Sequence, residues 1–229
     1  MKNHYAEHSR FYVAIDCIIF GFDKSSLNVL LVKRKFSPLK GGWSLMGGFL
    51  NDNESLDEAA ERILFSLTGL RNLYLEQLLS YGEVERDPAA RVISVSYYAL
   101  INTEDYNNEL GNKYGAKWFE LSKRPTLIFD HDEMLEKALR RLRRKTRSQP
   151  IGFELLPEKF TIPQLQKLYE AIHQVQLDKR NFRKRILAMN LLEKLSEKEK
   201  GASRKGAFLY RFDIEKYEEA INSGFLFEI

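Results

Sequence analysis

The chain has 229 residues, of which 44% are hydrophobic and 30% charged. This composition excludes wholesale disorder and suits one large or two small globular domains. The formal net charge of +4 is too small to identify a nucleic-acid binder by itself. The basic residues are concentrated instead in two places, with six in residues 140–147 and five in residues 178–185.

Cysteine usage and hydropathy indicate where the protein works. The single cysteine, Cys17, excludes an internal disulfide framework and fits a reducing compartment. The apolar run at residues 11–22 is too short to span a bilayer and contains Asp16, and no cleavable signal pattern follows it. We therefore expect a cytoplasmic protein with no membrane partner.

The first half of the chain contains several predicted strands. Segments rich in Val and Ile, or alternating in polarity, predict strands at residues 12–20, 27–33 and 92–100. A glycine-rich loop, residues 41–48, follows the second of them. Strands with helices between them predict an α+β fold, here an α/β/α sandwich.

Two helices are predicted in the same half. The first is capped by Asn53 or Ser55, runs to about Thr68 and is ended by Gly69. The second covers residues 132–145 and is amphipathic. Its apolar side comprises Leu135, Ala138, Leu139 and Leu142.

The composition changes after the second helix. Residues 148–157 contain Pro150, Gly152 and Pro157, which is typical of a domain junction. We therefore expect one domain over residues 1–147 and another over residues 148–229.

The second half predicts a winged helix-turn-helix. Thr161 starts one helix and Asp178 starts a second, basic helix. Strands at residues 191–195 and 207–212 enclose a polar, basic loop and form the wing. We expect the last helix, residues 213–222, to pack on the back of this domain.

One spacing in the first half resembles the Nudix box. The chain keeps several residues of the box at the expected spacing: Gly48, Glu54, Arg62 and the Gly69-Leu70 pair. The Nudix hydrolase family uses this loop–helix–loop to bind magnesium and cleave a diphosphate linkage. The family's three glutamates are absent, and their positions are occupied by Ile63, Ser66 and Leu67.

Nearby acids do not replace the missing glutamates. With Ile63 at 0° on a helical projection, they fall between about 120° and 220°, on the opposite side. These acids are Glu54, Asp57, Glu58 and Glu61. Magnesium needs converging carboxylate oxygens, so the acids are interpreted as a solvated helix face. We predict no metal site, no cofactor, no catalytic residue and no enzyme activity.

A fold that has lost its metal ligands can still keep a cleft, and this cleft can bind a small ligand. Asp16 interrupts an apolar strand, and a buried carboxylate is costly unless it is paired or used. The candidate ligand-binding residues are Asp16, Trp43, Glu83, Arg86 and Tyr97. Four of the five have a structural alternative: a salt-bridged Asp16, a packed Trp43, or surface charge on the turn of Glu83 and Arg86. His131 is interpreted as structural or capping, because no second histidine lies near it.

The basic helix and the wing carry the candidate DNA-binding residues. Phe182, Ile186 and Met189 point inward and leave a polar face outside. The predicted contacts are Lys179, Arg180, Asn181, Arg183 and Lys184 on the helix, and Lys198, Lys200, Arg204 and Lys205 on the wing. Asn and Arg can read base edges, whereas Lys mainly meets phosphate. The alternative is a solvated basic helix.

The whole chain resembles the Nudix-related transcriptional regulators. Matching stretches occur at residues 74–78, 86–88, 116–118, 129–131 and 179–183. The resemblance implies a dimeric repressor that binds double-stranded operator DNA and whose Nudix domain senses an effector. Within this family, the sequence most resembles the arabinose-responsive (AraR-type) members. It departs from the family at Met46, where a proline usually precedes the paired glycines.

We therefore expect a homodimeric regulator of sugar catabolism that releases DNA on binding L-arabinose. The alternatives are a regulator that senses ADP-ribose or related NAD metabolites, and a Nudix hydrolase with a relocated metal site. A further alternative is a ligand-binding module whose basic tail contacts another protein or RNA.

Overall fold

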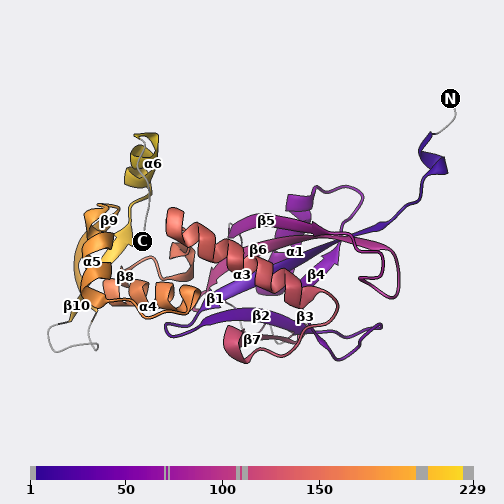
Figure 1. The fold of residues 1–229 in the computed structure, drawn as a ribbon, viewed down its shortest axis with the longest axis horizontal. Coiled ribbons are helices and arrows are strands. Elements are labelled where there is room, and N and C mark those ends of the chain that lie inside the picture. The colour runs from indigo at the N-terminus through magenta and orange to yellow at the C-terminus, as the bar shows by residue number, and fades with distance from the viewer. Residues whose placement is uncertain are drawn as a thin grey trace.

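The computed structural model describes residues 4–69, 71, 73–106, 109, 113–199 and 206–223. Figure 1 shows these residues as two parts along the long axis, a larger sheet with helices on its faces and a smaller helical part. Short 3-10 helices lie at η1 (His4–Glu7), η2 (Leu121–Lys123) and η3 (Phe153–Leu155). No helix within the described ranges has both the length and the apolar character that a bilayer crossing requires.

The larger sheet is built around a parallel pair of long strands. Its strands are β1 (Tyr12–Phe22), β2 (Leu27–Lys33), β3 (Trp43–Ser44), β4 (Met46–Phe49), β5 (Tyr74–Tyr81), β6 (Val92–Asn102) and β7 (Ala116–Glu120). The order is β3-β2-β1-β6-β5, with β4 paired to β1 and β7 to β2. β1 runs parallel to β6 from Tyr12↔Val92 to Phe22↔Asn102, and the other pairs are antiparallel.

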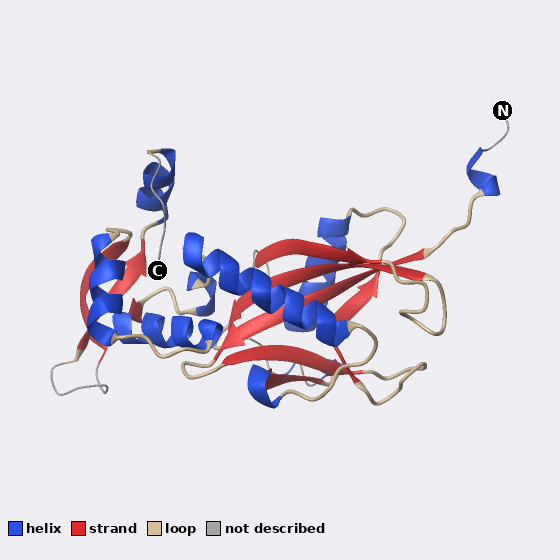
Figure 2. Cartoon of the chain, in the orientation of Figure 1, coloured by secondary structure: helices blue, strands red, loops and turns tan. Residues whose placement is uncertain are grey.

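Both faces of the central strands are buried. On β1, Ile15, Cys17 and Ile19 belong to one apolar cluster with helix α1 (Leu56–Thr68). Ile18, Phe20 and Phe22 belong to a second cluster with helix α3 (His131–Ser148). Figure 2 shows α3 lying along one face of the sheet. Because side chains alternate along a strand, each helix covers its own face, and the predicted α/β/α sandwich is confirmed.

Helix α1 begins and ends at sequence signals. The Ser55 side chain accepts a hydrogen bond from the Glu58 backbone, and the Glu58 side chain accepts one from the Ser55 backbone, which forms a capping box. Gly69 ends the helix in the left-handed region, at φ 75°, with its N–H donating to the Phe65 carbonyl. Ser55, rather than Asn53, is therefore the cap.

Replacing Gly69 by alanine is expected to lower the free energy of unfolding by about 1 kcal/mol, because a Cβ is strained at positive φ. Gly82→Ala is the matched control, since a Cβ at Gly82 meets no atom within 4 Å and Gly82 has no positive φ. Urea unfolding of both variants measures the effect. Equal stabilities for the two variants would contradict this explanation of the helix end.

Glu76 on β5 joins the sheet to α3. Its carboxylate accepts hydrogen bonds from the hydroxyls of Tyr74 (2.5 Å) and Tyr98 (2.8 Å) and from Arg141 (2.8 Å), and it pairs with Lys145. Burial by itself raises the pKa of Glu76, but the hydrogen bonds from Lys145, Tyr74 and Arg141 outweigh burial and lower this pKa to about 2. The ionised carboxylate therefore holds the helix on the sheet.

Replacing Glu76 by glutamine is expected to destabilise the protein by about 1–2 kcal/mol at pH 7, because partial solvent access screens the cluster. A lowered pKa means that this stabilisation is complete above the ordinary value of 4.5 and is lost as the pH falls towards about 2. The difference between wild type and Glu76→Gln in urea unfolding should therefore shrink below pH 4. Glu104→Gln, in an exposed pair with Lys24, is the control and should change stability little at any pH.

The smaller part packs two helices against a three-stranded sheet. Its elements are β8 (Phe160–Thr161), α4 (Ile162–His173), α5 (Lys179–Ala188), β9 (Leu192–Glu199), β10 (Ala207–Phe212) and α6 (Ile214–Asn222), with strand order β8-β10-β9. Thr161 caps α4 and Asp178 caps α5, as predicted. The apolar residues of α4 are buried together with those of α5: Leu165, Leu168, Tyr169, Ile172, Phe182 and Ile186. The arrangement of helices and hairpin confirms the predicted winged helix.

The two parts meet where α3 contacts α4. The Arg143 Nε donates to the Ile172 carbonyl at 2.7 Å, and the Thr146 hydroxyl lies 3.0 Å from the His173 Nε2. Apolar residues of both parts belong to one continuous cluster. α3 ends at Ser148, next to the predicted boundary between residues 147 and 148.

Helix α6 differs from its prediction. It was expected to pack on the back of the winged helix, but none of its residues is buried. Ile214 and Ile221 are exposed, and Figure 1 shows the helix standing away from the rest of the smaller part. The Tyr217 ring lies 5.9 Å from that of Phe212. The prediction was wrong because the presence of a helix in the sequence does not show whether another surface is available to cover it.

Candidate functional site

A cleft of about 380 Å³ opens between strands β1, β2 and β4 of the larger sheet and the first turn of α3. Residues from β1, the end of β2, the glycine-rich segment, the loop before β6 and the start of α3 line it. Its volume lies within the range of small-molecule sites. The cleft is therefore large enough for a small ligand, and two of the five candidate ligand-binding residues, Asp16 and Arg86, line it.

Asp16 lies at the base of this cleft. The Ser94 hydroxyl donates to its Oδ2 at 2.5 Å, and the side chain is buried. A Cβ at Gly47, the residue opposite Asp16 on β4, would lie 2.4 Å from Oδ1. Glycine at position 47 is therefore needed for the carboxylate to point into the cleft.

Arg86 closes one wall through paired buried charges. Its guanidinium makes two hydrogen bonds to Asp130, at 2.8 and 2.7 Å, and lies 3.8 Å from Asp16 Oδ2. The side chain of Arg86 is only 5% exposed. Because a buried charge must be paired, this two-pronged contact fixes the loop that carries Arg86 to the start of α3.

His131 completes the polar base of the cleft. The Leu45 backbone N–H donates to its Nδ1 at 3.1 Å, which places the proton of the neutral ring on Nε2. Nε2 lies 3.8 Å from Asp16 Oδ1. His131 is thus a lining residue, a placement that sequence reasoning missed because its partners lie far away in the chain.

Basic and aromatic side chains lie towards the mouth of the cleft. Lys33, Arg34 and Lys35 line it at the end of β2, a basic triplet that could have signalled the site. The Arg34 guanidinium lies 4.2 Å from the Phe36 ring and 5.1 Å from the Phe129 ring, while its Nε donates to two backbone carbonyls. These groups suit a ligand with an anionic part and a flat part.

The five candidate ligand residues fall in different places. Asp16 and Arg86 line the cleft. Trp43 packs edge-on against Phe119 with ring centroids 4.7 Å apart. Glu83 is exposed and lines a separate, more open depression. The Tyr97 hydroxyl donates to Asp57 on the α1 side of the sheet, at 2.6 Å. Ligand contact by any of the five stays a prediction.

The Nudix-box helix keeps its frame but offers no metal-binding face. Arg62 bonds Glu54 through Nε at 2.7 Å and also donates to the Phe49 carbonyl. Ile63 is buried against Gly48, and the Ser66 hydroxyl donates to the Ile63 carbonyl. Nowhere in the described part of the chain do three acidic, histidine or cysteine side chains gather as a cation would need. The residues present therefore do not fit the magnesium of the Nudix fold.

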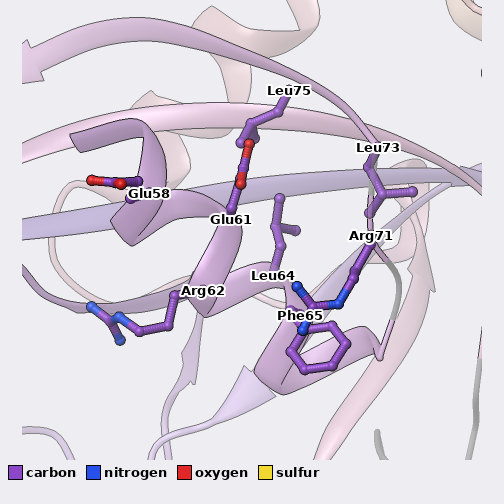
Figure 3. Close-up of a pocket in the computed structure, with 8 residues that line it drawn as sticks. All are labelled: Glu58, Glu61, Arg62, Leu64, Phe65, Arg71, Leu73 and Leu75. Atoms are coloured by element: carbon purple, nitrogen blue, oxygen red, sulfur yellow. The ribbon is translucent and has the colours of Figure 1, made fainter. Parts of the chain in front are cut away.

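The outer side of α1 carries a different pocket, of about 370 Å³. Figure 3 shows its lining around α1 and the start of β5, with the Arg71 guanidinium beside the Phe65 ring, 3.9 Å from its centroid. Glu58 and Glu61 line this pocket on the solvent side of the helix. They are exposed, as predicted for a solvated face.

The candidate DNA-binding face lies on α5. The five predicted helix residues and Arg185 are exposed, whereas Phe182 and Ile186 are buried. Within the described ranges, none of the basic side chains of α5 forms an ion pair. On the wing, Lys198 is exposed on β9. Lys200, Arg204 and Lys205 lie outside the described residues, and DNA contact stays a prediction for all nine.

Comparison with known families agrees with the two-part fold. Residues 10–142 match the NUDIX domain family, and residues 152–212 match the NrtR DNA-binding winged helix domain family. The fold and its two sites therefore define a Nudix domain joined to a DNA-binding winged helix.

Individual relatives are more specific. The ADPR responsive transcriptional repressor NtrR of Acinetobacter baylyi is 35% identical over 210 residues, 90% of this chain and 84% of the relative. The structure of Shewanella oneidensis NrtR complexed with a 27mer DNA matches with 30% identity and a TM-score of 0.80, over 90% of this chain and 95% of that one. The NUDIX domain of the same NrtR complexed with ADP ribose matches with 27% identity and a TM-score of 0.52, over 62% and 99%. The chain belongs to the NrtR family of Nudix-related transcriptional regulators.

This assignment corrects the expected subfamily. The predicted resemblance to arabinose-responsive regulators is not supported by these relatives, nor is L-arabinose as an effector. The physical reason lies in the cleft: a neutral pentose has no anionic group that could pair with its basic residues.

Proposed function

We propose that the protein is a DNA-binding transcriptional repressor whose Nudix cleft binds ADP-ribose and thereby releases DNA. The observation that carries this proposal is a cleft with cationic and aromatic groups beside a box helix that lacks metal ligands. Cations at the end of β2 suit a diphosphate, and the rings of Phe36 and Phe129 suit a nucleobase. A repressor like the bacterial NtrR of Acinetobacter baylyi works in the cytoplasm, and we propose this location here.

The DNA-binding half of the proposal rests on α5. Its exposed face presents side chains of both kinds that duplex recognition uses: Arg and Asn for base edges, and Lys for phosphate. The first turns of the second helix of a winged helix enter the major groove in this kind of docking. We infer that Lys179, Arg180, Asn181, Arg183 and Lys184 make these contacts.

Helix α3 is the element that can couple the two sites. Asp130 and His131 at its start line or brace the cleft, while Arg143 and Thr146 near its end contact α4. A ligand that moves the Arg86–Asp130 contact therefore shifts the helix that the winged part rests on. A coupling of about 1–3 kcal/mol would weaken DNA binding roughly 5–150-fold.

We also propose a homodimer, because two recognition helices in successive major grooves match a near-palindromic operator. Light scattering of the purified chain, free and with DNA, tests this part. A single copy bound per operator would contradict it.

Gel retardation tests the function as a whole. The chain should retard duplex DNA from its own upstream region, and ADP-ribose should release that DNA, whereas L-arabinose should not. Hydrolysis is the competing activity. Turnover of ADP-ribose with magnesium that Glu58→Gln abolishes would establish an enzyme with a relocated metal site and overturn the proposal.

A further inference from the structure

Two polar atoms at the base of the cleft, Asp16 Oδ1 and His131 Nε2, have no hydrogen-bond partner among the described residues. They lie 3.8 Å apart, which is too far for a hydrogen bond between them. Both residues line the cleft, and Asp16 is only 7% and His131 4% exposed. Because a buried polar group without a partner is costly, this pair indicates a place for a group that supplies both missing bonds.

The carboxylate of Asp16 is oriented so that one oxygen stays open. The Ser94 hydroxyl donates to Oδ2 at 2.5 Å, and the Arg86 guanidinium lies 3.8 Å from that same oxygen. A Cβ on Gly47 would lie 2.4 Å from Oδ1, so the glycine leaves this second oxygen uncovered. Oδ1 is therefore a fixed hydrogen-bond acceptor that is not engaged by the protein.

The ring of His131 is fixed as a donor beside that acceptor. The Leu45 backbone N–H donates to Nδ1 at 3.1 Å, so the proton of the neutral ring is on Nε2. The Ser44 hydroxyl, 3.3 Å from Nδ1, donates to the Leu45 carbonyl at 2.8 Å. The Phe129 ring packs edge-on against the imidazole, with centroids 5.6 Å apart. These contacts hold the Nε2–H next to Asp16 Oδ1.

The chemistry of the pair selects a hydroxyl group. A hydroxyl donates one hydrogen bond and accepts another, so it can bind the carboxylate oxygen and the imidazole N–H together. A phosphate is unsuitable, because the base already has two carboxylates, Asp16 and Asp130, against the single guanidinium of Arg86. An apolar group would leave both polar atoms unpaired.

We propose that Asp16 Oδ1 and His131 Nε2 bind a hydroxyl of the distal ribose of ADP-ribose, the ribose that carries no adenine. The inference rests on the proposed function and gives the direction in which the ligand lies. Basic residues 33–35 and Phe36 lie towards the mouth, where they suit the diphosphate and the adenine. The sugar beyond the diphosphate is then the part that reaches the base. Asp16 and His131 therefore distinguish ADP-ribose from nucleotides that end at a phosphate.

Calorimetric titration of the full chain with ADP-ribose and with ADP tests this assignment, because ADP has the same adenosine and diphosphate but no distal ribose. Wild type should bind ADP-ribose at least about tenfold more tightly than ADP, since ADP leaves the two polar atoms unpaired. His131→Phe keeps a ring and removes the donor. It should weaken ADP-ribose binding about tenfold and change ADP binding less than about twofold.

Asp16→Asn tests the acceptor with almost no change of shape. The Ser94 hydroxyl needs an oxygen at the position of Oδ2, so the amide places its NH₂ at the position of Oδ1 and turns the acceptor into a donor. ADP-ribose binding should again fall about tenfold, whereas ADP binding should not weaken. Asp52→Asn removes the same charge from an exposed residue outside the cleft lining and should leave both affinities unchanged.

The ratio of the two affinities separates a specific role from a structural one. Damage to the cleft would weaken ADP-ribose and ADP alike, and so would contact with the adenosine ribose, so equal losses would overturn the inference. An unchanged ratio in Asp16→Asn would also overturn it, whatever the thermal stability of His131→Phe. If wild type does not bind ADP-ribose, the proposed function fails and the inference falls with it. Tight ADP-ribose binding with an unchanged ratio contradicts the inference alone.

Discussion

Replacing Arg86 by methionine is expected to lower the free energy of unfolding by about 3–5 kcal/mol and to abolish the response of DNA binding to ADP-ribose. The guanidinium is 5% exposed and makes two hydrogen bonds to Asp130, with Asp16 3.8 Å away. Without it, two carboxylates at the base of the cleft lose their cationic neighbour. Urea unfolding and retardation of DNA with added ADP-ribose measure the two effects.

Two further variants separate the ion pair from the loss of side-chain volume. Arg86→Met combined with Asp130→Asn removes both charges and should recover part of the lost stability. Arg71→Met is the control, because that arginine is exposed and should change stability by less than about 0.5 kcal/mol. A loss below about 1 kcal/mol for Arg86→Met would show that the pair does not hold the cleft together.

Replacing Asn181 or Arg183 by alanine is expected to cost about 1–3 kcal/mol on a preferred operator and to relax the choice of base there. Both side chains are exposed on α5, within two turns of the Asp178 cap. Lys198→Ala should instead weaken binding to all sequences alike and reduce the salt slope by about 1. Titration of selected and random duplexes at several salt concentrations distinguishes the two kinds of loss.

The control for these variants is Lys167→Ala, an exposed lysine of α4. It should leave affinity and base preference close to those of wild type. Equal losses on operator and random DNA for Asn181→Ala, Arg183→Ala and Lys198→Ala would count against α5 as the helix that reads bases.

Local signals in the sequence were sufficient for the framework. Helix α1 begins after Ser55 and ends at Gly69, and helices α4 and α5 begin after Thr161 and Asp178. These ends were predictable because a cap acts within one helical turn. Apolar periodicity likewise predicted which side of α3 is buried. These features depend on residues a few positions apart, which a single sequence displays directly.

The base of the cleft depends on contacts that no local pattern shows. Arg86 meets Asp130 across 44 positions, and His131 meets the Leu45 backbone across 86. Trp43 was a reasonable ligand candidate from its glycine-rich surroundings, yet its ring packs against Phe119, which lies 76 positions later in the sequence on β7. Asp16 was predictable because a carboxylate in an apolar strand needs a partner or a use.

The effector could not be predicted from local sequence patterns either. The box spacing predicted the helix and the loss of its metal ligands, since Ile63, Ser66 and Leu67 can be counted from Gly48. The basic triplet at residues 33–35 is visible in the sequence, but only the fold places it at a cleft together with Phe129, His131 and Asp16. A general likeness to one subfamily could not substitute for that geometry.

In the proposed function, the cleft binds ADP-ribose without cleaving it, and this binding lowers the affinity of the protein for DNA. One experiment tests this directly: ADP-ribose and magnesium are added to the purified protein–DNA complex, while DNA release and nucleotide products are followed in the same tube. The account predicts that DNA is released and that the ADP-ribose is recovered intact. Formation of AMP and ribose 5-phosphate by the protein, or saturating ADP-ribose with the DNA still bound, would contradict it.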